Sequence, residues 1–161
     1  MKQATYAQTM DSPLGLLTLL GNGKALTSLR IADKPLADKA QLQSGAKDAV
    51  LTKAKQQLKK YFAGQLSKFD IPMEADGTPF QKKVWRTLSK IPFGKTASYK
   101  DIAVMMGNPK ACRAVGTANG KNPLCIVVPC HRVISHDGSL GGYTGGLSKK
   151  RYLLSLEADA R

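Results

Sequence analysis

The chain has 161 residues, 42% of them apolar, and a formal net charge of +14. This length supports one good hydrophobic core or two small ones. No apolar run approaches the roughly 20 residues that a membrane span needs, and the N-terminal Met1–Tyr6 lacks the apolar segment of a signal peptide. The composition therefore predicts a soluble, unexported, cytoplasmic protein with no membrane partner, associated with the nucleoid if the source is bacterial.

The positive charge is distributed unevenly along the chain. Residues 1–80 carry 11 basic and 7 acidic side chains, whereas residues 81–161 carry 14 basic and 4 acidic ones. A lysine-rich solvated surface is the alternative explanation, but it does not account for this asymmetry. The second half is therefore expected to meet a polyanion, and nucleic acid is the favoured partner.

The 3 cysteines show no C-x-x-C spacing, so neither a disulfide framework nor a zinc knuckle is indicated. Cys125, Cys130, His131 and His136 could be arranged around a metal ion, but their spacing matches no standard site. We expect no metal and no cofactor.

The first half predicts a small antiparallel sheet followed by a helix. Strands are expected over 5–9, 16–20 and 25–31, because turn sequences separate these apolar segments and Asn22-Gly23 is a strong hairpin signal. Residues 33–45 are polar and irregular. A helix should run from Ala46 to Gly64, with a helically spaced apolar set: Val50, Ala54, Leu58, Tyr61 and Phe62. Residues 1–75 are thus interpreted as a supporting α/β domain without His or Cys, with 67–77 as its linker.

The second half, residues 76–161, opens with a helix whose start is marked by Thr78, Pro79 and the capping-box Gln81. Its apolar stripe is interpreted as core rather than as a base-stacking platform: Phe80, Val84, Trp85 and Leu88. Ser98 can cap a short helix over 99–106, with an apolar face of Ile102, Ala103, Met105 and Met106. Gly107 breaks it, and Asn108-Pro109 should start another over 110–119. The pair predicts a helix-turn-helix.

The second helix of that pair has an unusual composition for a helix that recognises DNA sequence. It offers small residues, Ala111, Ala114, Gly116 and Ala118, and one long donor, Arg113. Small residues permit close approach but carry no base code, which suits a protein that fits a groove by shape and inserts one arginine to flip a base. The alternative is that the alanines only pack this helix on its neighbours.

A second pattern is typical of an activated cysteine. The apolar run Leu124–Val128 predicts a buried strand that stops at Pro129, so Cys130 should stand at a strand end with His131 and Arg132 next in line. A thiol becomes a strong nucleophile beside a base or a cation, although a free cysteine is often only a small buried hydrophobe.

A loop and a final helix complete the chain. The loop 138–146 has five glycines in nine residues and could wrap a planar ligand. Ser148 could cap the helix, whose apolar face is Tyr152, Leu153 and Leu156. Glu157 beside that face could orient a histidine.

The helix-turn-helix, the segment Val128-Pro-Cys-His-Arg-Val-Ile134, the segment Gly142-Tyr-Thr-Gly-Gly146 and the late glutamate, in this order, resemble the O6-alkylguanine-DNA alkyltransferases. The match spans about residues 78–158, and Ser12-Pro-Leu-Gly15 resembles a turn in the family's N-terminal domain. Some members bind zinc through N-terminal cysteines and histidines, which this chain lacks before Cys112. The resemblance therefore implies no metal.

The resemblance implies a role for each matching residue. Cys130 would accept and keep the alkyl group, His131 would take the thiol proton through a water, and Glu157 would hold the imidazole. Arg132 would tie the turn to neighbouring structure. Asn122 would fix the turn that presents the thiol, and Tyr99 would contact a phosphate and the base. Arg113 would be inserted into the DNA from a helix whose DNA-facing residues are Ala111, Ala114 and Gly116. The guanine pocket would be lined by Tyr143, Thr144 and Val133.

The expected fold class is α/β, with a small N-terminal domain of antiparallel sheet plus helix followed by a mainly helical, winged-helix-like helix-turn-helix domain. The expected function is irreversible transfer of a methyl or larger alkyl group from O6 of guanine in duplex DNA to Cys130, after minor-groove binding and base flipping, by a monomer. Action on O4-alkylthymine and cooperativity on DNA stay open. The alternatives are a Cys-His hydrolase or acyltransferase, which would need an oxyanion site, and a DNA-binding module without chemistry.

Overall fold

The computed structural model describes residues 6–31, 43–143 and 145–160. The chain divides into two compact units between Asp76 and Gly77, called unit 1 and unit 2 below. Among the described residues, none of the helices combines the length and the apolarity needed to cross a bilayer.

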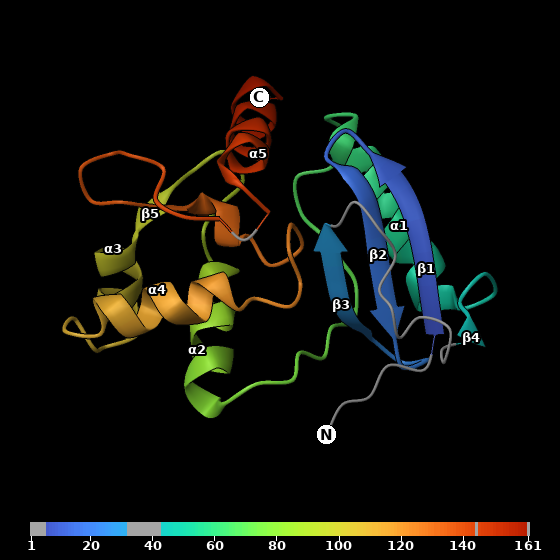
Figure 1. Ribbon diagram of the computed structural model, residues 1–161, viewed down its shortest axis with the longest axis horizontal. Coiled ribbons are helices and arrows are strands. Elements are labelled where there is room, and N and C mark those ends of the chain that lie inside the picture. The colour runs from blue at the N-terminus through green and yellow to red at the C-terminus, as the bar shows by residue number, and fades with distance from the viewer. Residues whose placement is uncertain (1–5, 32–42, 144, 161) are drawn as a thin grey trace. The chain divides into compact units, whose positions relative to one another are not determined.

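Unit 1 contains a four-stranded sheet in the order β3-β2-β1-β4 (Figure 1). The strands are β1 (Tyr6–Ser12), β2 (Gly15–Gly21), β3 (Leu26–Ile31) and β4 (Gln43–Ser44). The first three pair antiparallel as expected, while β4 pairs parallel with β1. The expectation of irregular structure up to residue 45 is wrong for β4, a strand of two residues that is too short to leave an alternating pattern. Residues 33–42 of that expectation lie outside the described residues.

Side-chain hydrogen bonds explain why the chain reverses between these strands. Ser12 Oγ donates to the Gly15 carbonyl at 2.7 Å and accepts from the Leu14 amide at 3.1 Å. In the next turn, Asn22 Oδ1 accepts from the amides of Lys24 and Ala25, both at 2.9 Å. Serine and asparagine stabilise turns in this way because their short side chains reach backbone amides two or three residues on.

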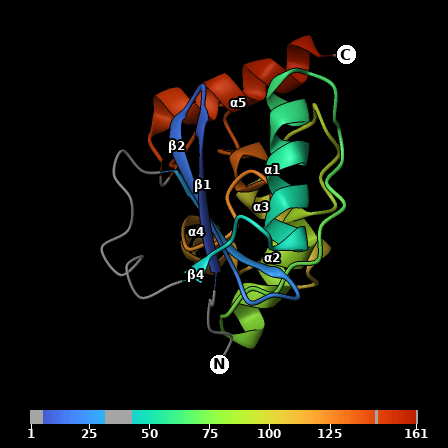
Figure 2. The ribbon, with the colours of Figure 1, turned by 90° about the vertical axis from the view of Figure 1, so that its right-hand side faces the viewer.

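Helix α1 (Ala49–Phe62) covers one face of this sheet (Figure 2). It begins three residues later than expected, because Asp48 Oδ2 accepts from the Leu51 amide at 2.9 Å and caps it there. The side chains that reach the core are Leu51, Ala54, Leu58 and Tyr61, whereas Val50 and Phe62 stay partly exposed. Gly64 ends the helix as predicted, with a φ of 75° that favours glycine.

The segment expected to be a linker, residues 67–77, is partly built into unit 1. Leu26 on β3 donates its amide to the Pro72 carbonyl at 2.8 Å and accepts from the Glu74 amide at 3.0 Å. Ile71 is buried. The chain therefore runs beside β3 before it leaves the unit.

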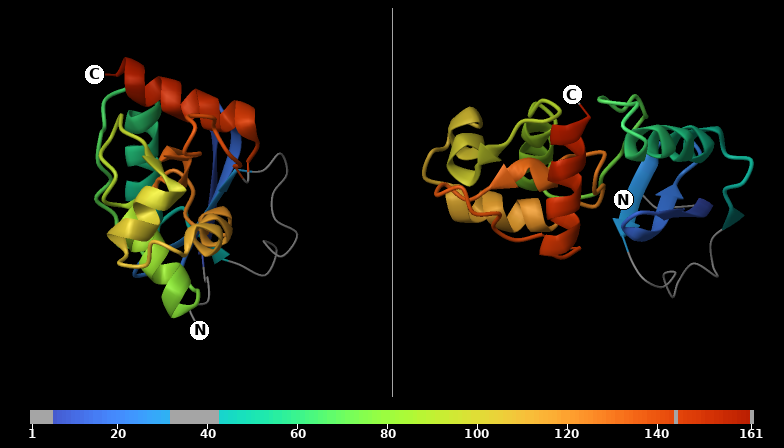
Figure 3. Two further views of the ribbon diagram at one scale, coloured as in Figure 1. Left: turned by 90° about the vertical axis from the view of Figure 1, so that its left-hand side faces the viewer. Right: turned by 90° about the horizontal axis from the view of Figure 1, so that it is seen from above.

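Unit 2 is mainly helical, as predicted. Its helices are α2 (Pro79–Leu88), α3 (Tyr99–Met105), α4 (Cys112–Gly120) and α5 (Leu147–Asp159) (Figure 3). Capping boxes open α2 at Thr78 and α3 at Ser98. Trp85 of α2 donates its indole N–H to the Ala118 carbonyl of α4 at 2.9 Å, which fixes the helix-turn-helix formed by α3 and α4 on its support. A short parallel ladder joins β5 (Ala97–Ser98) to β6 (Val133–Ile134).

Several details of the helices differ from expectation. Helix α4 begins at Cys112 instead of 110, and neither its N-cap residue Ala111 nor Asn108 caps it with a side chain. Helix α5 begins at Leu147 after Gly146, so Ser148 lies inside it and does not cap it. Four residues assigned to the apolar faces of these helices are less buried than expected: Met105 and Tyr152 are exposed, and Phe80 and Leu156 are half-buried.

The expectation of a strand over Leu124–Val128 is wrong. This run is buried except for the half-buried Cys125, but its backbone folds into tight turns that lead into a 3-10 turn over Cys130–Arg132. Burial alone leaves an apolar run that resembles a core strand, and only the local hydrogen bonds distinguish the two. The fold class is otherwise confirmed, with a small sheet-plus-helix unit followed by a helical unit.

Candidate active site

The turn before Cys130 is held by Asn122, whose side chain bonds backbone on both sides of it. Asn122 Nδ2 donates to the Val128 carbonyl at 2.9 Å, and its Oδ1 accepts from the Leu124 amide at 3.0 Å. Inside the turn, Ile126 has a φ of 74°. A β-branched residue adopts this conformation at a cost of about 1–3 kcal/mol, so the surrounding hydrogen bonds impose a strained backbone just ahead of the thiol.

Cys130 is almost completely buried, with 3% of its surface exposed, and its pKa is lowered. A hydrogen bond from the Cys125 side chain lowers this pKa most, and a hydrogen bond from Asn122 and the positive charge of Lys150 lower it further. Desolvation by burial opposes them. Because the thiolate is the nucleophilic form, these neighbours raise the reactivity of Cys130.

Behind the thiol, a buried cluster of charged side chains joins the Cys130–Arg132 turn to α5. Glu157 is 1% exposed, and its Oε2 lies 2.6 Å from His131 Nε2. Arg132 donates to both carboxylate oxygens, Nε to Oε1 at 2.8 Å and Nη2 to Oε2 at 3.0 Å, and Nη1 donates to the Ile91 carbonyl at 2.7 Å. Arg132 therefore ties the turn to its neighbours, and Glu157 holds both side chains that follow Cys130.

This geometry determines which nitrogen of His131 can act as a base. A carboxylate only accepts hydrogen bonds, so Nε2 carries the proton that Glu157 accepts. Nδ1 then has the lone pair, and it has no hydrogen-bond partner among the described residues. Burial lowers the pKa of His131, with Arg132 and Lys150 acting in the same direction and Glu157 in the opposite one. The imidazole is thus neutral at pH 7 and able to accept a proton.

Lys150 of α5 is a fully buried lysine that sequence reasoning missed. Its Nζ donates to the carbonyls of Val133 at 2.6 Å, Gly142 at 3.0 Å and Leu140. Burial lowers the pKa of this ammonium, while the negative charge of Cys130 raises it. Lys150 therefore fastens the glycine-rich loop to β6 and places a positive charge near the thiol.

The thiol opens into a small pocket of about 140 Å³ between α3, α4 and the glycine-rich loop. Its lining comprises Tyr99, Gly116, Asn119, Gly120, Cys130, Gly142 and Tyr143. Gly141 keeps the loop close, because its φ is 68° and a Cβ there would lie 2.8 Å from the Tyr99 hydroxyl oxygen. Burial raises the pKa of Tyr99, so its hydroxyl keeps its proton at neutral pH.

The structure brings together some of the residues singled out from the sequence and separates others. Tyr99, Tyr143, Gly116 and Cys130 line the pocket, with His131 and Glu157 in the buried cluster and Asn122 in the turn. Arg113 and Ala114 are exposed on α4, and Ala111 is half-buried just before it. Val133 is fully buried and is not among the side chains that line the pocket. Thr144 lies outside the described residues.

Besides Lys150, which lies outside the pocket lining, sequence reasoning also failed to assign two residues that line the pocket. Asn119 and Gly120 end α4 at the pocket, and Asn119 Nδ2 donates to the Cys130 carbonyl at 3.4 Å. An asparagine in a helix of small residues is only weak evidence, from the sequence, for a residue of the site. Lys150 could have been found more easily, because its spacings of three and seven residues from Leu153 and Glu157 place it on the same, buried face of the predicted helix.

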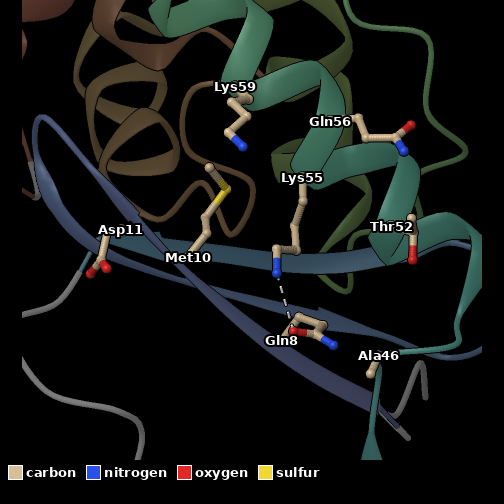
Figure 4. A pocket seen from close by; sticks show the side chains of 8 residues that line it. All are labelled: Gln8, Met10, Asp11, Ala46, Thr52, Lys55, Gln56 and Lys59. Carbon is tan, nitrogen blue, oxygen red and sulfur yellow. Dashed lines mark hydrogen bonds between the residues drawn. The ribbon is translucent and has the colours of Figure 1, made fainter.

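Unit 1 has a groove of about 690 Å³ between β1 and α1 (Figure 4). Its lining includes Lys55, whose Nζ donates to Gln8 Oε1 at 3.4 Å, together with Met10, Asp11 and Lys59. The groove is larger than the pocket at Cys130, but its lining contains no thiol and no imidazole. Among its lining residues it therefore lacks the thiol and imidazole chemistry found around Cys130.

No group of three or more His, Cys, Asp or Glu side chains is arranged to hold a metal ion in the part of the chain that the structure describes. His136, which the sequence spacing could have joined to the cysteines, is exposed after β6.

Comparisons with known proteins match nearly the whole chain. The family described as "6-O-methylguanine DNA methyltransferase, ribonuclease-like domain" matches residues 5–75. The family described as "6-O-methylguanine DNA methyltransferase, DNA binding domain" matches residues 79–159.

Individual relatives agree with these matches. A methylated-DNA--protein-cysteine methyltransferase of Mycolicibacterium paratuberculosis is 49% identical over 93% of this chain and 90% of its own length. A constitutive one from Bacillus subtilis is 44% identical over 94% of each. A crystal structure of Mycobacterium tuberculosis OGT in complex with DNA is 46% identical, with a TM-score of 0.90, and the match covers 97% of this chain and 94% of that one.

Proposed function

The chain belongs to the 6-O-methylguanine DNA methyltransferase family, and from this premise we propose that it repairs duplex DNA by moving an alkyl group from O6 of guanine to its own Cys130. One observation carries the proposal: a thiol of lowered pKa faces a small pocket beside a helix-turn-helix, with a neutral histidine and its carboxylate partner behind it. Each molecule would act once, because the product thioether is stable.

The chemistry is a displacement at the alkyl carbon. His131 Nδ1 takes the Cys130 proton through a bridging water, and the resulting imidazolium is stabilised by Glu157. The sulfur forms a bond to the alkyl carbon as the bond from that carbon to O6 breaks, and the electron pair remains on the guanine. The Tyr99 hydroxyl is protonated and lines the pocket, so it can donate a hydrogen bond to the departing base. These groups supply general-base catalysis and positioning.

Helix α4 is the proposed DNA-binding element. Its exposed side carries Arg113, Ala114 and Thr117, and Gly116 borders the pocket. Small side chains let the helix approach a minor groove closely, and Arg113 is the one long side chain available to fill the space left by a flipped nucleotide. The pocket beside this helix would then receive the guanine, with Tyr143 and Tyr99 against it.

We assign these steps to residues 76–161 and a supporting role to residues 1–75. The DNA substrate would place the protein in the compartment that holds the chromosome, which is the cytoplasm in a bacterium. A monomer would suffice, since all the reacting groups come from one chain.

The test is intact-mass measurement after incubation with a duplex containing O6-methylguanine. We expect the chain to gain one methyl group in place of one hydrogen, in a yield that never exceeds one per molecule, and to keep it. The same duplex with unmodified guanine is the control, and digestion should locate the methyl on the 122–132 peptide.

The same experiment separates the two rival functions. A Cys-His hydrolase or acyltransferase would turn over repeatedly without a lasting methyl adduct, and a binding module would bind the duplex and show no mass change. Either result with well-folded protein contradicts the proposal.

A further inference from the structure

Two thiols flank the strained turn, Cys125 just before Ile126 and Cys130 after it. Short backbone hydrogen bonds fold the chain back between them: Val127 N to the Cys125 carbonyl at 2.8 Å, Val128 N to the Leu124 carbonyl at 2.9 Å, and Cys130 N to the Val128 carbonyl at 2.8 Å. Cys125 Sγ lies 3.9 Å from the Asn122 carbonyl, and the side chains of Asn122 and Cys125 are both hydrogen-bonded to the Cys130 thiol. Five positions apart in sequence, the two sulfur atoms are thus neighbours in space.

Their surroundings give the two thiols different properties. Cys130 is nearly buried, but its pocket of about 140 Å³ can admit a molecule as small as a peroxide. Cys125 is half-buried, and Cys112, at the start of α4, directs its thiol to the Pro109 carbonyl at 3.7 Å. A reactive thiol with a second thiol beside it is the arrangement found where a sulfenic acid is converted to a disulfide.

We propose that Cys125 is a resolving thiol, which captures Cys130 as an intramolecular disulfide when a peroxide oxidises it. The Cys130 thiolate attacks a peroxide oxygen, so that an S–O bond forms, the O–O bond breaks, and water leaves after protonation. The Cys125 sulfur then attacks the Cys130 sulfur, the S–O bond breaks, and a second water departs with the Cys125 proton. Two thiols lose two electrons in total, and the peroxide gains them.

Such a disulfide would protect Cys130, which can accept an alkyl group only once on the proposed function, from irreversible oxidation. Without a resolving thiol, a sulfenic acid proceeds to sulfinic and sulfonic acids, which ordinary thiols do not reduce. A disulfide between Cys125 and Cys130 can be reduced by thiol–disulfide exchange with a cellular dithiol, which restores both thiols. The inference goes beyond the proposed function, and its main measurement needs no DNA.

The experiment treats the full chain with hydrogen peroxide, blocks remaining thiols with iodoacetamide, and digests it with trypsin without reduction. Cleavage after Lys121 and Arg132 leaves Cys125 and Cys130 together in one peptide, whereas Cys112 falls in the separate peptide 111–113. We expect peptide 122–132 to lose two hydrogens and to take up no iodoacetamide. Dithiothreitol should restore both thiols.

Cys125→Ser supplies the comparison, and Cys112→Ser is the matched control that removes a thiol outside the pair. After equal peroxide treatment and reduction, Cys125→Ser should retain oxygen on Cys130 and regain at least about threefold less reactive thiol than the parent. Cys112→Ser should behave as the parent does. The proposal is wrong if the parent's 122–132 peptide carries added oxygen instead of the disulfide, if Cys125→Ser recovers as fully as the parent, or if Cys112 is found in the cross-link. Should Cys125→Ser fail to fold, the parent peptide alone decides.

Discussion

The two units bury very different side chains. Among the described residues, the buried polar side chains of unit 1 are hydroxyls, those of Thr18, Thr27 and Ser28. Unit 2 buries His131, Arg132, Lys150 and Glu157 together with two asparagines, Asn119 and Asn122. Unit 2 also contains Ile126, the described non-glycine residue with a positive φ.

This difference between the two units has an energetic consequence. A core such as that of unit 1 is stabilised mainly by apolar burial, whereas a buried charge costs several kcal/mol unless its partners are well placed. Unit 2 compensates that cost with the paired contacts of Glu157 and the three carbonyls around Lys150. Buried charges and the strained backbone are thus concentrated around Cys130, and the predictions below test whether that concentration serves the proposed transfer.

The largest effect is expected from Cys130→Ser, which should leave no detectable methyl transfer, since a serine hydroxyl is a far weaker nucleophile than a thiolate. Binding to alkylated duplex should persist, because other residues form the pocket and α4. Intact mass and duplex affinity measure the two properties, and Cys112→Ser is the control. If Cys130→Ser still acquires a methyl group, the acceptor lies elsewhere.

The comparison of the units is tested most directly by Glu157→Ala against Leu58→Ala. Removing Glu157 leaves Arg132 buried without its carboxylate, so we expect a loss of about 3–5 kcal/mol in the free energy of unfolding and transfer slowed about 10²-fold. Leu58→Ala in the core of unit 1 should also cost about 2–5 kcal/mol, yet folded protein should transfer at nearly the parent rate. Urea unfolding and single-turnover rates provide both values.

Glu157→Gln refines this result, because the amide can still accept from His131 but has lost its charge. Transfer by Glu157→Gln at a rate between those of the parent and Glu157→Ala would support an electrostatic contribution. Equal slowing by Leu58→Ala and Glu157→Ala would show that stability, and not the charged cluster, controls the rate.

A smaller effect is expected from Arg113→Ala. Extruding a base costs a few kcal/mol of stacking and pairing, and an inserted arginine offsets part of that cost, so transfer from saturating duplex should slow about tenfold. Free O6-benzylguanine needs no flipping and should react within about twofold of the parent rate. Lys110→Ala is the matched control, since it removes one exposed positive charge just before α4. If Arg113→Ala reacts with saturating duplex as fast as the parent, the inserted role is wrong.

The smallest expected effect is a loss of folding stability at acidic pH through protonation of His131. Burial places the pKa of His131 below its ordinary value of about 6.5, so the unfolded chain binds more protons than the folded one below that pH. Stability from this group is present above about pH 6.5 and is lost as the pH falls toward the folded-state pKa, at up to about 1.4 kcal/mol per pH unit.

Urea midpoints between about pH 7.5 and 5.5 measure this dependence. His131→Gln should reduce the slope, whereas His136→Gln should retain it, because His136 is exposed. An unchanged slope in His131→Gln would contradict the assignment. The rate of transfer should fall over the same range, since a protonated imidazole cannot accept the thiol proton.

Much of the fold could be predicted from the sequence, because many turns and helix caps depend on hydrogen bonds between residues close together in the chain. The turns at Ser12 and Asn22 and the caps at Thr78 and Ser98 depend on hydrogen bonds between residues two to four apart, so the residue types alone point to them. The segments around Cys130 and Tyr143 likewise indicated the family, which the comparisons confirm.

Other features depend on partners distant in sequence. The run Leu124–Val128 looked like a strand because it is apolar and buried, but it turns because Asn122 bonds across it. Strand β4 exists only because β1 is there to pair with it. In both cases the decisive hydrogen bonds leave no periodic trace in the sequence.

The sequence by itself determined the main helices, the first three strands, the family and the neighbours of Cys130 along the chain, because these are encoded in contiguous residues. Only the tertiary structure decided which groups meet Cys130 in space: Lys150 comes from α5, Asn119 from α4, and Cys125 returns through a turn. The physical reason is that burial and charge at a site are sums over neighbours from several segments, and those sums exist only after the chain has folded.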